Sequence, residues 1–382
     1  MDFALNKDQN TLREEIIRFV RKELNNGALE RDREQAFPHD LWLKCGEMRL
    51  QGLPVPEEYG GRGLDPLSTA LALEAFGYGC EDGGLVFSVC AHLLAGVVPV
   101  WKYGSEEQKR RYLPGLCNGT LIAANGMTEP GSGSDIFSMS TRAEPDGDGF
   151  RINGTKTLVT NDPVADVVVV YTVTGAKKGL SGGLSVFLVE RGTPGLQVSQ
   201  KFEKMGLRTA MMGAMTFEDV YVPASAVLGG VGAGMTIFFN SMGWERVGIS
   251  ASHVGTMRRL VEKGIERART RVVSGQPIGK HQAVSHKIAD MKIRLEAARL
   301  LAYKSAWSLG QTRENAMDAS ITKVFVSESL VKTALDTVQV FGGYGFLTEY
   351  EVERTLRDAI GSTLYSGTNE IQRNIIARWL GL

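Results

Sequence analysis

Apolar positions in roughly the first 120 residues recur at helical spacings, as in TLREEIIRFVRKEL, LSTALALEAFGYG and EEQKRRYLPGL. The Pro- and Gly-rich stretch LPVPEEYGGRGLDP separates these helical segments. From about residue 122 the pattern changes to short β-branched runs, ADVVVVYTVTG, GGLSVFLVERG and AMTFEDVYVP, bounded by Gly, Pro and Asp as strands commonly are. The pattern therefore predicts a compact β-region that follows a helical one.

Long helical patterns return after about residue 235. One of them places apolar residues at alternating steps of three and four, namely Ile288, Met291, Leu295, Ala298 and Ala302. Residues at these steps share one face of a helix, which favours packing in an antiparallel bundle. The order helix, strand, helix predicts an α+β fold with three domains. We expect an N-terminal helical domain at 1–121, a middle β-domain at 122–234 and a C-terminal helical domain at 235–382.

Composition narrows the classes of protein to consider. A length of 382 residues and a hydrophobic content of 43% suit two or three domains around a large core. Lys plus Arg and Asp plus Glu both total 43, so a neutral chain offers no field for nucleic acid or an anionic membrane. The N-terminus has no apolar leader and no run of about 18 apolar residues is evident, which predicts a cytoplasmic protein without a membrane span.

Metal and disulfide chemistry are not expected from the residue spacing. The four cysteines, Cys45, Cys80, Cys90 and Cys117, show neither a CxxC pair nor Cys/His ligand spacing. The five histidines form no ligand motif either. Reduced cytosolic thiols fit this pattern best.

Three segments are candidates for ligand contacts. GMTEPGSGSDI, residues 126–136, contains a Gly/Ser turn whose backbone amides and hydroxyls could face a phosphate or a ring edge. NGTKTLVTND, residues 153–162, has the pattern of a hairpin. QVFGGYGF, residues 339–346, ends a helical pattern with glycines that let a ligand approach the backbone closely. Each segment alone is explained as well by an ordinary turn or by a glycine helix cap.

Together with YSGTNEIQ near the C-terminus, the segments TEPGSGSD, TKTLVTN and QVFGGYGF resemble the acyl-CoA dehydrogenase family of flavoenzymes in order and interval. The resemblance extends over essentially the whole chain. It implies a β-barrel-like middle domain, a C-terminal four-helix bundle and a homotetramer, or less often a dimer. It also implies FAD, held between the middle and C-terminal domains and across a subunit interface.

The resemblance assigns cofactor contacts residue by residue. The flavin and its diphosphate would be lined by Met127, Thr128, Gly133 and Ser134. Thr160 would lie near the reactive flavin nitrogen, and Leu158 stands where the family often has a Trp beside the flavin. The diphosphate and adenine of a cofactor shared with a neighbouring subunit would be held by Arg271, Gln282, Gln339 and Gly343. Thr368 and Glu370 would close the same pocket, and Ser274 departs from the family's usual Phe.

In this family a base removes the α-proton of an acyl thioester while hydride leaves the β-carbon for the flavin. Many members carry Glu directly after the Tyr of the C-terminal loop, but here Ser366 follows Tyr365. A serine hydroxyl has too high a pKa to replace that Glu, and no histidine lies nearby in sequence to activate it. Isovaleryl-type and long-chain members keep the base on a helix, at the position of Glu245, so the resemblance predicts Glu245 as the base.

The neighbours of Glu245 leave two interpretations open. Trp244 is an apolar neighbour able to raise the pKa of the carboxylate, as a base would need. A solvated glutamate in the first turn of a helix is the plain structural alternative. Arg246 could orient the C-terminal loop. We expect substrate contacts from Ser134, Arg246, Tyr365, Ser366 and Gly367.

The substrate branch is suggested by CAHLLAGVVPVWKYGSEEQKRRYL, LIAANGMTEP, NSMGWE and LYSGTNEIQRNIIARWLGL. These segments resemble the prolyl-carrier-protein dehydrogenases, which oxidise a prolyl group tethered to a peptidyl carrier in natural product biosynthesis. One alternative is a short branched-chain, isovaleryl-like acyl-CoA dehydrogenase, because both substrates end in a phosphopantetheine arm. Another is a non-catalytic flavin-binding homologue. A flavoprotein and oxygen both remain open as the electron acceptor.

Overall fold

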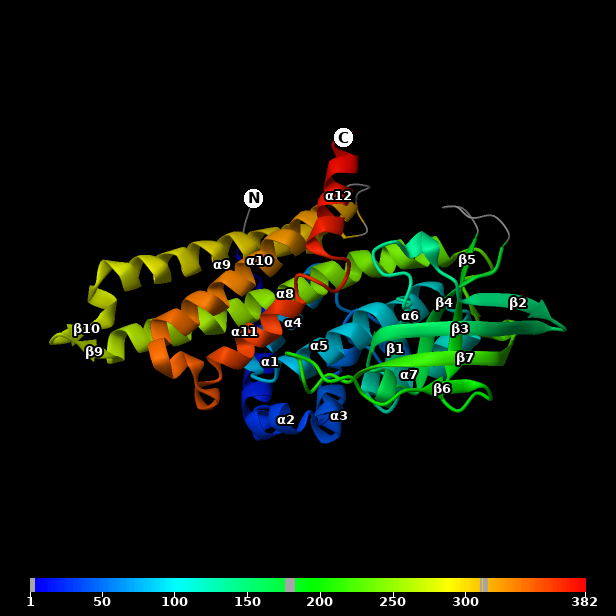
Figure 1. Ribbon diagram of the computed structural model, residues 1–382, viewed down its shortest axis with the longest axis horizontal. Helices are drawn as coiled ribbons and strands as arrows, with labels where there is room; N and C mark the ends of the chain where they lie inside the picture. Colours follow the sequence, from blue (N-terminus) through cyan, green and yellow to red (C-terminus); the bar gives the residue numbers. More distant parts are fainter. Residues whose placement is uncertain (1–3, 176–182, 310, 312–314) are drawn as a thin grey trace.

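The computed structural model describes residues 4–175, 183–309, 311 and 315–382. Figure 1 shows an elongated molecule with a β-sheet at one end and long helices that run to the other. Capping boxes at Asn6 and Ser105 begin the first and last helices of the N-terminal region. The helices of this region are α1 (Lys7–Glu23), α2 (Ala28–Glu34), α3 (His39–Glu47), α4 (Pro66–Gly79), α5 (Gly83–Ala91), α6 (Val98–Tyr103) and α7 (Glu106–Asn118).

The helical stretch Gly83–Tyr103 connects α5 to α6 through a π-helical segment, His92–Val97. Its 21 residues are long and apolar enough to cross a membrane by length and composition alone. The expectation that the chain has no such run is therefore wrong. The structure buries 89% of the apolar window inside the protein, which is how a core helix packs.

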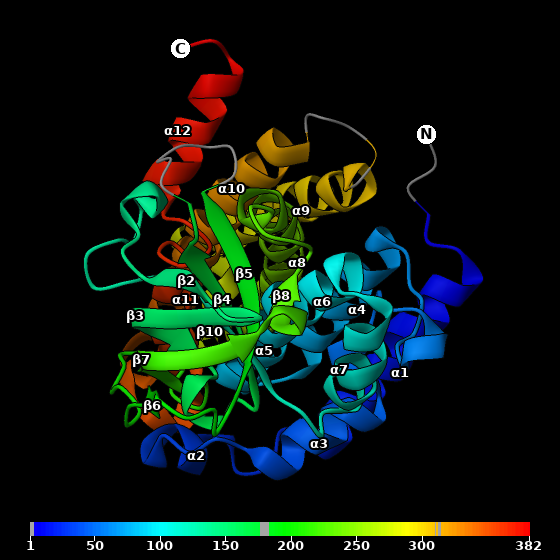
Figure 2. The ribbon, with the colours of Figure 1, turned by 90° about the vertical axis from the view of Figure 1, so that its right-hand side faces the viewer.

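The middle region is an eight-stranded sheet with the order β6-β7-β3-β2-β4-β5-β8, in which β1 pairs in parallel with β4. The β-branched runs of the sequence form β4, β5 and β7, which confirms those predicted strands. The strands are β1 (Ala123–Gly126), β2 (Arg142–Asp146), β3 (Gly149–Thr160), β4 (Val167–Val173), β5 (Leu184–Glu190), β6 (Leu196–Val198), β7 (Met212–Pro223) and β8 (Val227–Leu228). In Figure 2 the sheet faces the viewer, and α4, α6 and α7 lie beside it.

A bulge in β3 prepares one edge of the site. β3 and β7 pair antiparallel from Gly149 opposite Pro223 to Thr160 opposite Met212, with a register shift between Lys156 and Val159. The shift leaves Leu158 at a φ of 55°, in the left-handed region that a side-chain-bearing residue rarely adopts. As a result, the Leu158 side chain is 58% exposed although it belongs to a central strand.

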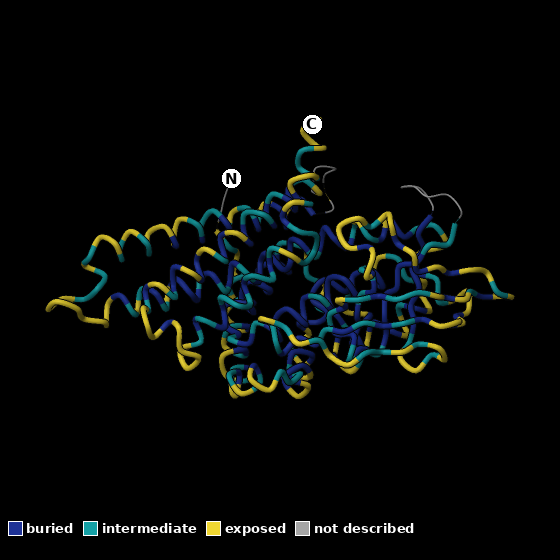
Figure 3. The backbone as a smooth tube through the Cα atoms, in the orientation of Figure 1, coloured by how far each residue is buried: buried dark blue, intermediate teal, exposed yellow. Residues whose placement is uncertain are grey.

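The C-terminal region contains α8 (Gly234–Thr270), α9 (Gln282–Ser308), α10 (Asn315–Phe341), α11 (Val352–Gly361) and α12 (Asn369–Trp379). The strands β9 (Val272–Val273) and β10 (Gln276–Pro277) form a hairpin at the far tip of the molecule (Figure 1). The predicted apolar face of α9 is confirmed, because Met291, Leu295, Ala298 and Ala302 are buried and Ile288 packs against the same cluster. Figure 3 shows the buried backbone concentrated where the sheet meets the helices, whereas the outer side of α9 is exposed.

Candidate active site

Glu245 and the loop before α12 meet at the centre of the candidate site. Glu245 lies within α8, which begins at Gly234, so the interpretation as a first-turn glutamate is wrong. The hydroxyl of Ser366 donates a hydrogen bond to Glu245 Oε1 at 2.5 Å. Arg246, the next residue on α8, donates from Nε to the backbone oxygen of Ser366 at 3.2 Å. The structure thus brings Glu245, the predicted base on the helix, into contact with Ser366, the loop residue that replaces the usual glutamate.

The electrostatics around Glu245 are those of a partly buried acid with nearby cations. Burial raises the pKa of Glu245 above the usual glutamate value, and the Ser366 hydrogen bond, Arg246 and Lys323 partly offset this rise. Burial lowers the pKa of Arg246 to about 10 and that of Lys323 to about 8. Lys323 Nζ donates to Asn369 Oδ1 at 2.7 Å, at the start of α12. A carboxylate with a raised pKa is suited to accepting a proton near neutral pH.

Tyr365 closes one side of this site. Its ring stacks on Phe87 of α5 with centroids 4.4 Å apart, and its hydroxyl lies 2.9 Å from His253 Nε2. Burial lowers the pKa of His253 to about 3, so the imidazole is neutral and adds no charge. A small cavity of about 40 Å³ is lined by both stacked rings and also by Val86, Leu330, His253 and Asp358.

The loop that contains Met127 and Thr128 is held by a buried ion pair that the sequence analysis missed. Lys156 Nζ donates to Glu129 Oε1 at 2.8 Å, and Lys156 also donates to the backbone oxygen of Met127 at 3.2 Å. Thr157 N donates to Thr128 O at 2.9 Å, which ties the loop to β3 next to Leu158. Glu129 lies in the TEPGSGSD segment and Lys156 in the TKTLVTN segment. Charged residues are usually exposed, so the sequence pattern does not indicate that these two are buried.

Burial and hydrogen bonding act in opposite directions on the two ionised groups. Burial raises the pKa of Glu129, but hydrogen bonds from Lys156, Ser140 and Thr141 outweigh it and bring the pKa to about 2. Burial lowers the pKa of Lys156 to about 8, and Glu129 offsets only part of this effect. Both groups are therefore charged at neutral pH, and the pair holds the loop as an ionic contact.

The predicted flavin-side residues border open space. A Cβ added at Gly133 would meet nothing within 4 Å, and the neighbouring Ser134 is exposed. The exposed Leu158 presents an apolar side chain, and Thr160 ends the same strand. Thr368 caps α12 by accepting from Ile371 N at 3.4 Å, and Glu370 is exposed in the first turn of that helix. These positions fit a flavin ring and a phosphate-bearing chain.

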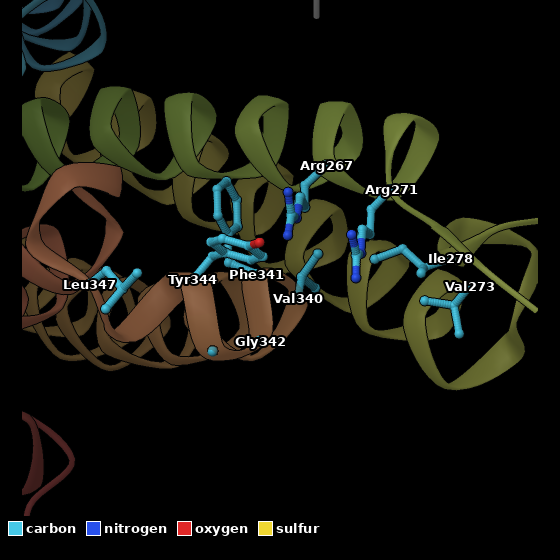
Figure 4. A pocket seen from close by; sticks show the side chains of 10 residues that line it. Arg267, Arg271, Val273, Ile278, Val340, Phe341, Gly342, Tyr344 and Leu347 are labelled. Carbon is cyan, nitrogen blue, oxygen red and sulfur yellow. The ribbon is translucent and has the colours of Figure 1, made fainter.

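A second cavity, of about 410 Å³, lies at the far end of the molecule. Two predicted cofactor residues, Arg271 and Gly343, line it together. Figure 4 shows Arg271 beside Arg267 in this cavity. Gln282 and Gln339 are exposed on the adjacent ends of α9 and α10 but do not line this cavity. The sequence analysis missed Arg267, whose guanidinium lies 4.9 Å from the Tyr344 ring centroid. Its Nε is buried and has no hydrogen-bond partner among the described residues. The two arginines and the open backbone at Gly343 fit the diphosphate and adenine of a dinucleotide.

The far cavity adjoins the C-terminal end of α8 at Arg267 and Arg271, whereas Ser252, His253 and Arg259 in the middle of the helix line the smaller cavity. At a rise of about 1.5 Å per residue, the helix separates Glu245 from Arg271 by roughly 40 Å. This distance exceeds the span of one extended dinucleotide. Thr368 and Glu370 follow Ser366 in the loop that contacts Glu245, so these predicted cofactor residues lie far from Arg271 within one chain.

Comparison with known proteins gives a consistent result. Models of the acyl-CoA dehydrogenase N-terminal, middle and C-terminal domains match residues 6–120, 124–220 and 232–381. The chain is 42% identical over 383 residues to an L-prolyl peptidyl-carrier protein dehydrogenase of Pseudomonas fluorescens, with 100% of both chains covered. The solved structure of the prolyl acyl carrier protein oxidase AnaB is 44% identical, with a TM-score of 0.97 over 99% of this chain and 100% of that one. The structure of PigA with FAD and proline is 41% identical, with a TM-score of 0.97 over 100% of both chains.

Proposed function

The chain belongs to the acyl-CoA dehydrogenase family, and from this premise we propose that it oxidises the α and β carbons of an acyl thioester with FAD. The observation that carries the proposal is the partly buried Glu245 carboxylate, whose pKa is raised by burial and which is fixed by Ser366. Such a group can remove a weakly acidic proton when it is held beside the substrate.

Glu245 takes the α-proton of the bound thioester. The electron pair of that C–H bond becomes part of the new carbon–carbon double bond as hydride leaves the β-carbon. When bound, FAD supplies the hydride acceptor. The bound substrate would contact Ser134, Arg246, Tyr365, Ser366 and Gly367. The flavin end of FAD would be held by Met127, Thr128, Gly133, Leu158, Thr160, Thr368 and Glu370.

The far cavity serves a cofactor of a neighbouring subunit. The distance of roughly 40 Å along α8 between Glu245 and Arg271 supports this assignment, because one dinucleotide cannot bridge it. Arg271, Gln282, Gln339 and Gly343 would contact the diphosphate and adenine of that partner cofactor. The site is then complete only in an oligomer, for which we propose a homotetramer.

The acyl group is a prolyl-type aminoacyl group on a carrier protein. Similarity over the whole chain to prolyl-carrier dehydrogenases and to PigA with FAD and proline supports this substrate. The Phe87–Tyr365 stack supports a short acyl group of either kind, because two packed rings limit the depth available to an acyl chain. A short branched acyl-CoA is the second candidate, since it satisfies the same limit. A non-catalytic flavin-binding homologue is disfavoured by the fixed carboxylate.

Several finer features belong to the same proposal. The middle sheet would close into a barrel-like form, and the C-terminal helices would pack as a four-helix bundle in each subunit. Electrons would pass from the reduced cofactor to a flavoprotein or to oxygen. The enzyme would work in the cytoplasm.

Anaerobic mixing of the FAD-loaded protein with defined substrates tests the proposal. Bleaching of the flavin absorbance by prolyl-carrier protein, and not by isovaleryl-CoA, is expected. Bleaching by isovaleryl-CoA alone would assign the acyl-CoA alternative. A yellow protein bleached by neither thioester would contradict the dehydrogenase activity.

The base assignment has its own variant and a matched control. Glu245→Gln should slow flavin bleaching by about 10²-fold or more while FAD stays bound, because the amide cannot accept the proton. Glu262→Gln changes a glutamate of the same helix that pairs with Arg258 and Tyr78, and it should leave the rate unchanged. An undiminished rate in Glu245→Gln would refute Glu245 as the base.

A further inference from the structure

The Ser366 hydroxyl contacts the carboxylate of Glu245, although the sequence suggested only that Ser366 touches the substrate. We propose that Ser366 is a positioning residue, which fixes Glu245 Oε1 through its hydroxyl and leaves Oε2 to receive the substrate proton. This role rests on the proposed function, because it concerns the base of that reaction. It gives the Ser366 hydroxyl a function at a loop position that carries no carboxylate.

The backbone around Ser366 is fixed from two sides. Arg246 Nε and Gln372 Nε2 both donate to the backbone oxygen of Ser366, at 3.2 Å and 3.1 Å. Gln372 Nε2 also donates to Gly367 O at 3.0 Å. Ser366 itself has a φ of 58°, in the left-handed region. These contacts hold the uncommon backbone conformation of Ser366 and so fix the point from which its side chain reaches Glu245.

The same loop is anchored to α10 by a buried lysine. Lys323 Nζ donates to Thr363 O at 3.3 Å and to Asn369 Oδ1 at 2.7 Å, so it spans the loop on both sides of Ser366. Ser327 donates to Asn369 Oδ1 at 3.1 Å as well. These hydrogen bonds from α10 hold the loop that carries Ser366 in place on both sides of the residue.

A donor at this position favours the ionised form of Glu245. A carboxylate is a better acceptor than a carboxylic acid, so the hydrogen bond opposes the effect of burial on the pKa. The positive charges that face Glu245 are Arg246 on α8 and Lys323 on α10. Removal of the Ser366 hydroxyl takes away one of these three stabilising contacts and leaves the two charges in place.

Apart from Arg246 and Lys323, which are charged below about pH 8, the titratable groups within electrostatic reach of Glu245 stay neutral. Burial raises the pKa of the Cys90 thiol on α5 to about 12. Burial also raises the pKa values of Tyr171 on β4 and Tyr365 in the loop, and both are within electrostatic reach of Glu245. The acid side of the pH–rate profile therefore reports on Glu245.

Two variants, Ser366→Ala and Ser366→Gly, test the role. Each removes the hydroxyl, but Ala is strained at positive φ and Gly is not, so a shared effect belongs to the hydroxyl and not to the backbone. In both variants, the pH at which anaerobic flavin bleaching by prolyl-carrier protein reaches half its maximal rate should rise by about one unit. Below that midpoint, both variants should be about tenfold slower than the unaltered enzyme.

Infrared difference spectra provide a readout that needs no turnover. The protonated-carboxyl band that is absent in Glu245→Gln belongs to Glu245, and its titration midpoint should rise by the same amount in both Ser366 variants. Unchanged midpoints in both variants would overturn the positioning role. Failure of the unaltered enzyme to bleach with any thioester would instead contradict the proposed function, whatever the infrared midpoint.

Discussion

Lys156 Nζ lies 2.8 Å from Glu129 Oε1, and both side chains are excluded from solvent. The pair connects β3 to the loop that precedes β2, so it joins the TKTLVTN segment to the TEPGSGSD segment. Glu129 also accepts from Ser140 N at 2.7 Å and from Thr141 N at 2.9 Å. One buried carboxylate therefore fixes the loop on which the proposed flavin contacts depend.

Glu129→Gln should destabilise the protein and loosen its hold on FAD. The change leaves the buried Lys156 ammonium without its counter-ion, which typically costs about 3 kcal/mol of unfolding free energy. Urea denaturation and the FAD content after gel filtration measure the two effects. Asp146→Asn, which breaks the exposed pair with Arg151, should cost less than about 1 kcal/mol and retain FAD. Equal small losses in both variants would contradict the structural role of the buried pair.

The depressed pKa of Glu129 predicts that the free energy of unfolding falls at acid pH. Its folded pKa is about 2, below the ordinary value of 4.5, so the stabilisation it gives is complete above pH 4.5 and is lost as pH falls toward 2. Gln resembles the protonated acid. The difference in unfolding free energy between the unaltered protein and Glu129→Gln should therefore shrink as the pH falls through this window. A difference that stays constant down to pH 2 would show that the Glu129 pKa is not depressed.

Local patterns were sufficient to predict some elements but not the contacts between them. The strands β4, β5 and β7 and the buried face of α9 follow from spacings within a few residues, and the structure confirms them. The contact between Ser366 and Glu245 joins residues 121 positions apart, so no local pattern indicates it. Long-range contacts of this kind build the site, so its geometry follows from the folded chain and not from the spacing of neighbouring residues.

Two features were not predicted from the sequence because they involve polar or charged residues that the fold buries. Charged residues such as Glu129 and Lys156 are normally placed on the surface, and only their pairing in the folded chain allows them inside. His92 interrupts the apolar stretch Gly83–Tyr103, but one ring nitrogen lies 2.9 Å from Leu116 O and the other accepts from Ala123 N at 2.9 Å. A histidine satisfied in this way allows a membrane-like stretch to serve as a core helix.

The Phe87–Tyr365 stack predicts which acyl chains are excluded. Phe87→Ala should enlarge the cavity that both rings line, which has a volume of about 40 Å³. The ratio of kcat/KM for a hexanoyl group to that for a prolyl group, both tethered to the carrier protein, should rise by about tenfold, the effect expected of one or two extra methylene groups in an apolar pocket. Phe150→Ala breaks a similar ring pair, with Phe187 in the sheet, and should lower stability without changing this ratio. An unchanged ratio in folded Phe87→Ala would show that the stack does not limit chain length.

Moving the carboxylate from α8 to the loop tests the geometry of the site most directly. The Ser366 Oγ is 2.5 Å from Glu245 Oε1, so a carboxylate carried by residue 366 can reach the volume that the native base occupies. Glu245→Ala should abolish flavin bleaching, and the double variant Glu245→Ala/Ser366→Glu should recover part of the lost rate. Recovery should be incomplete, because Glu at a φ of 58° costs about 1 kcal/mol and the helix no longer fixes the base. Anaerobic stopped-flow traces of both variants provide the measurement, with FAD content as the control for folding. A double variant that binds FAD and is no faster than Glu245→Ala would show that the two positions do not serve the same substrate carbon.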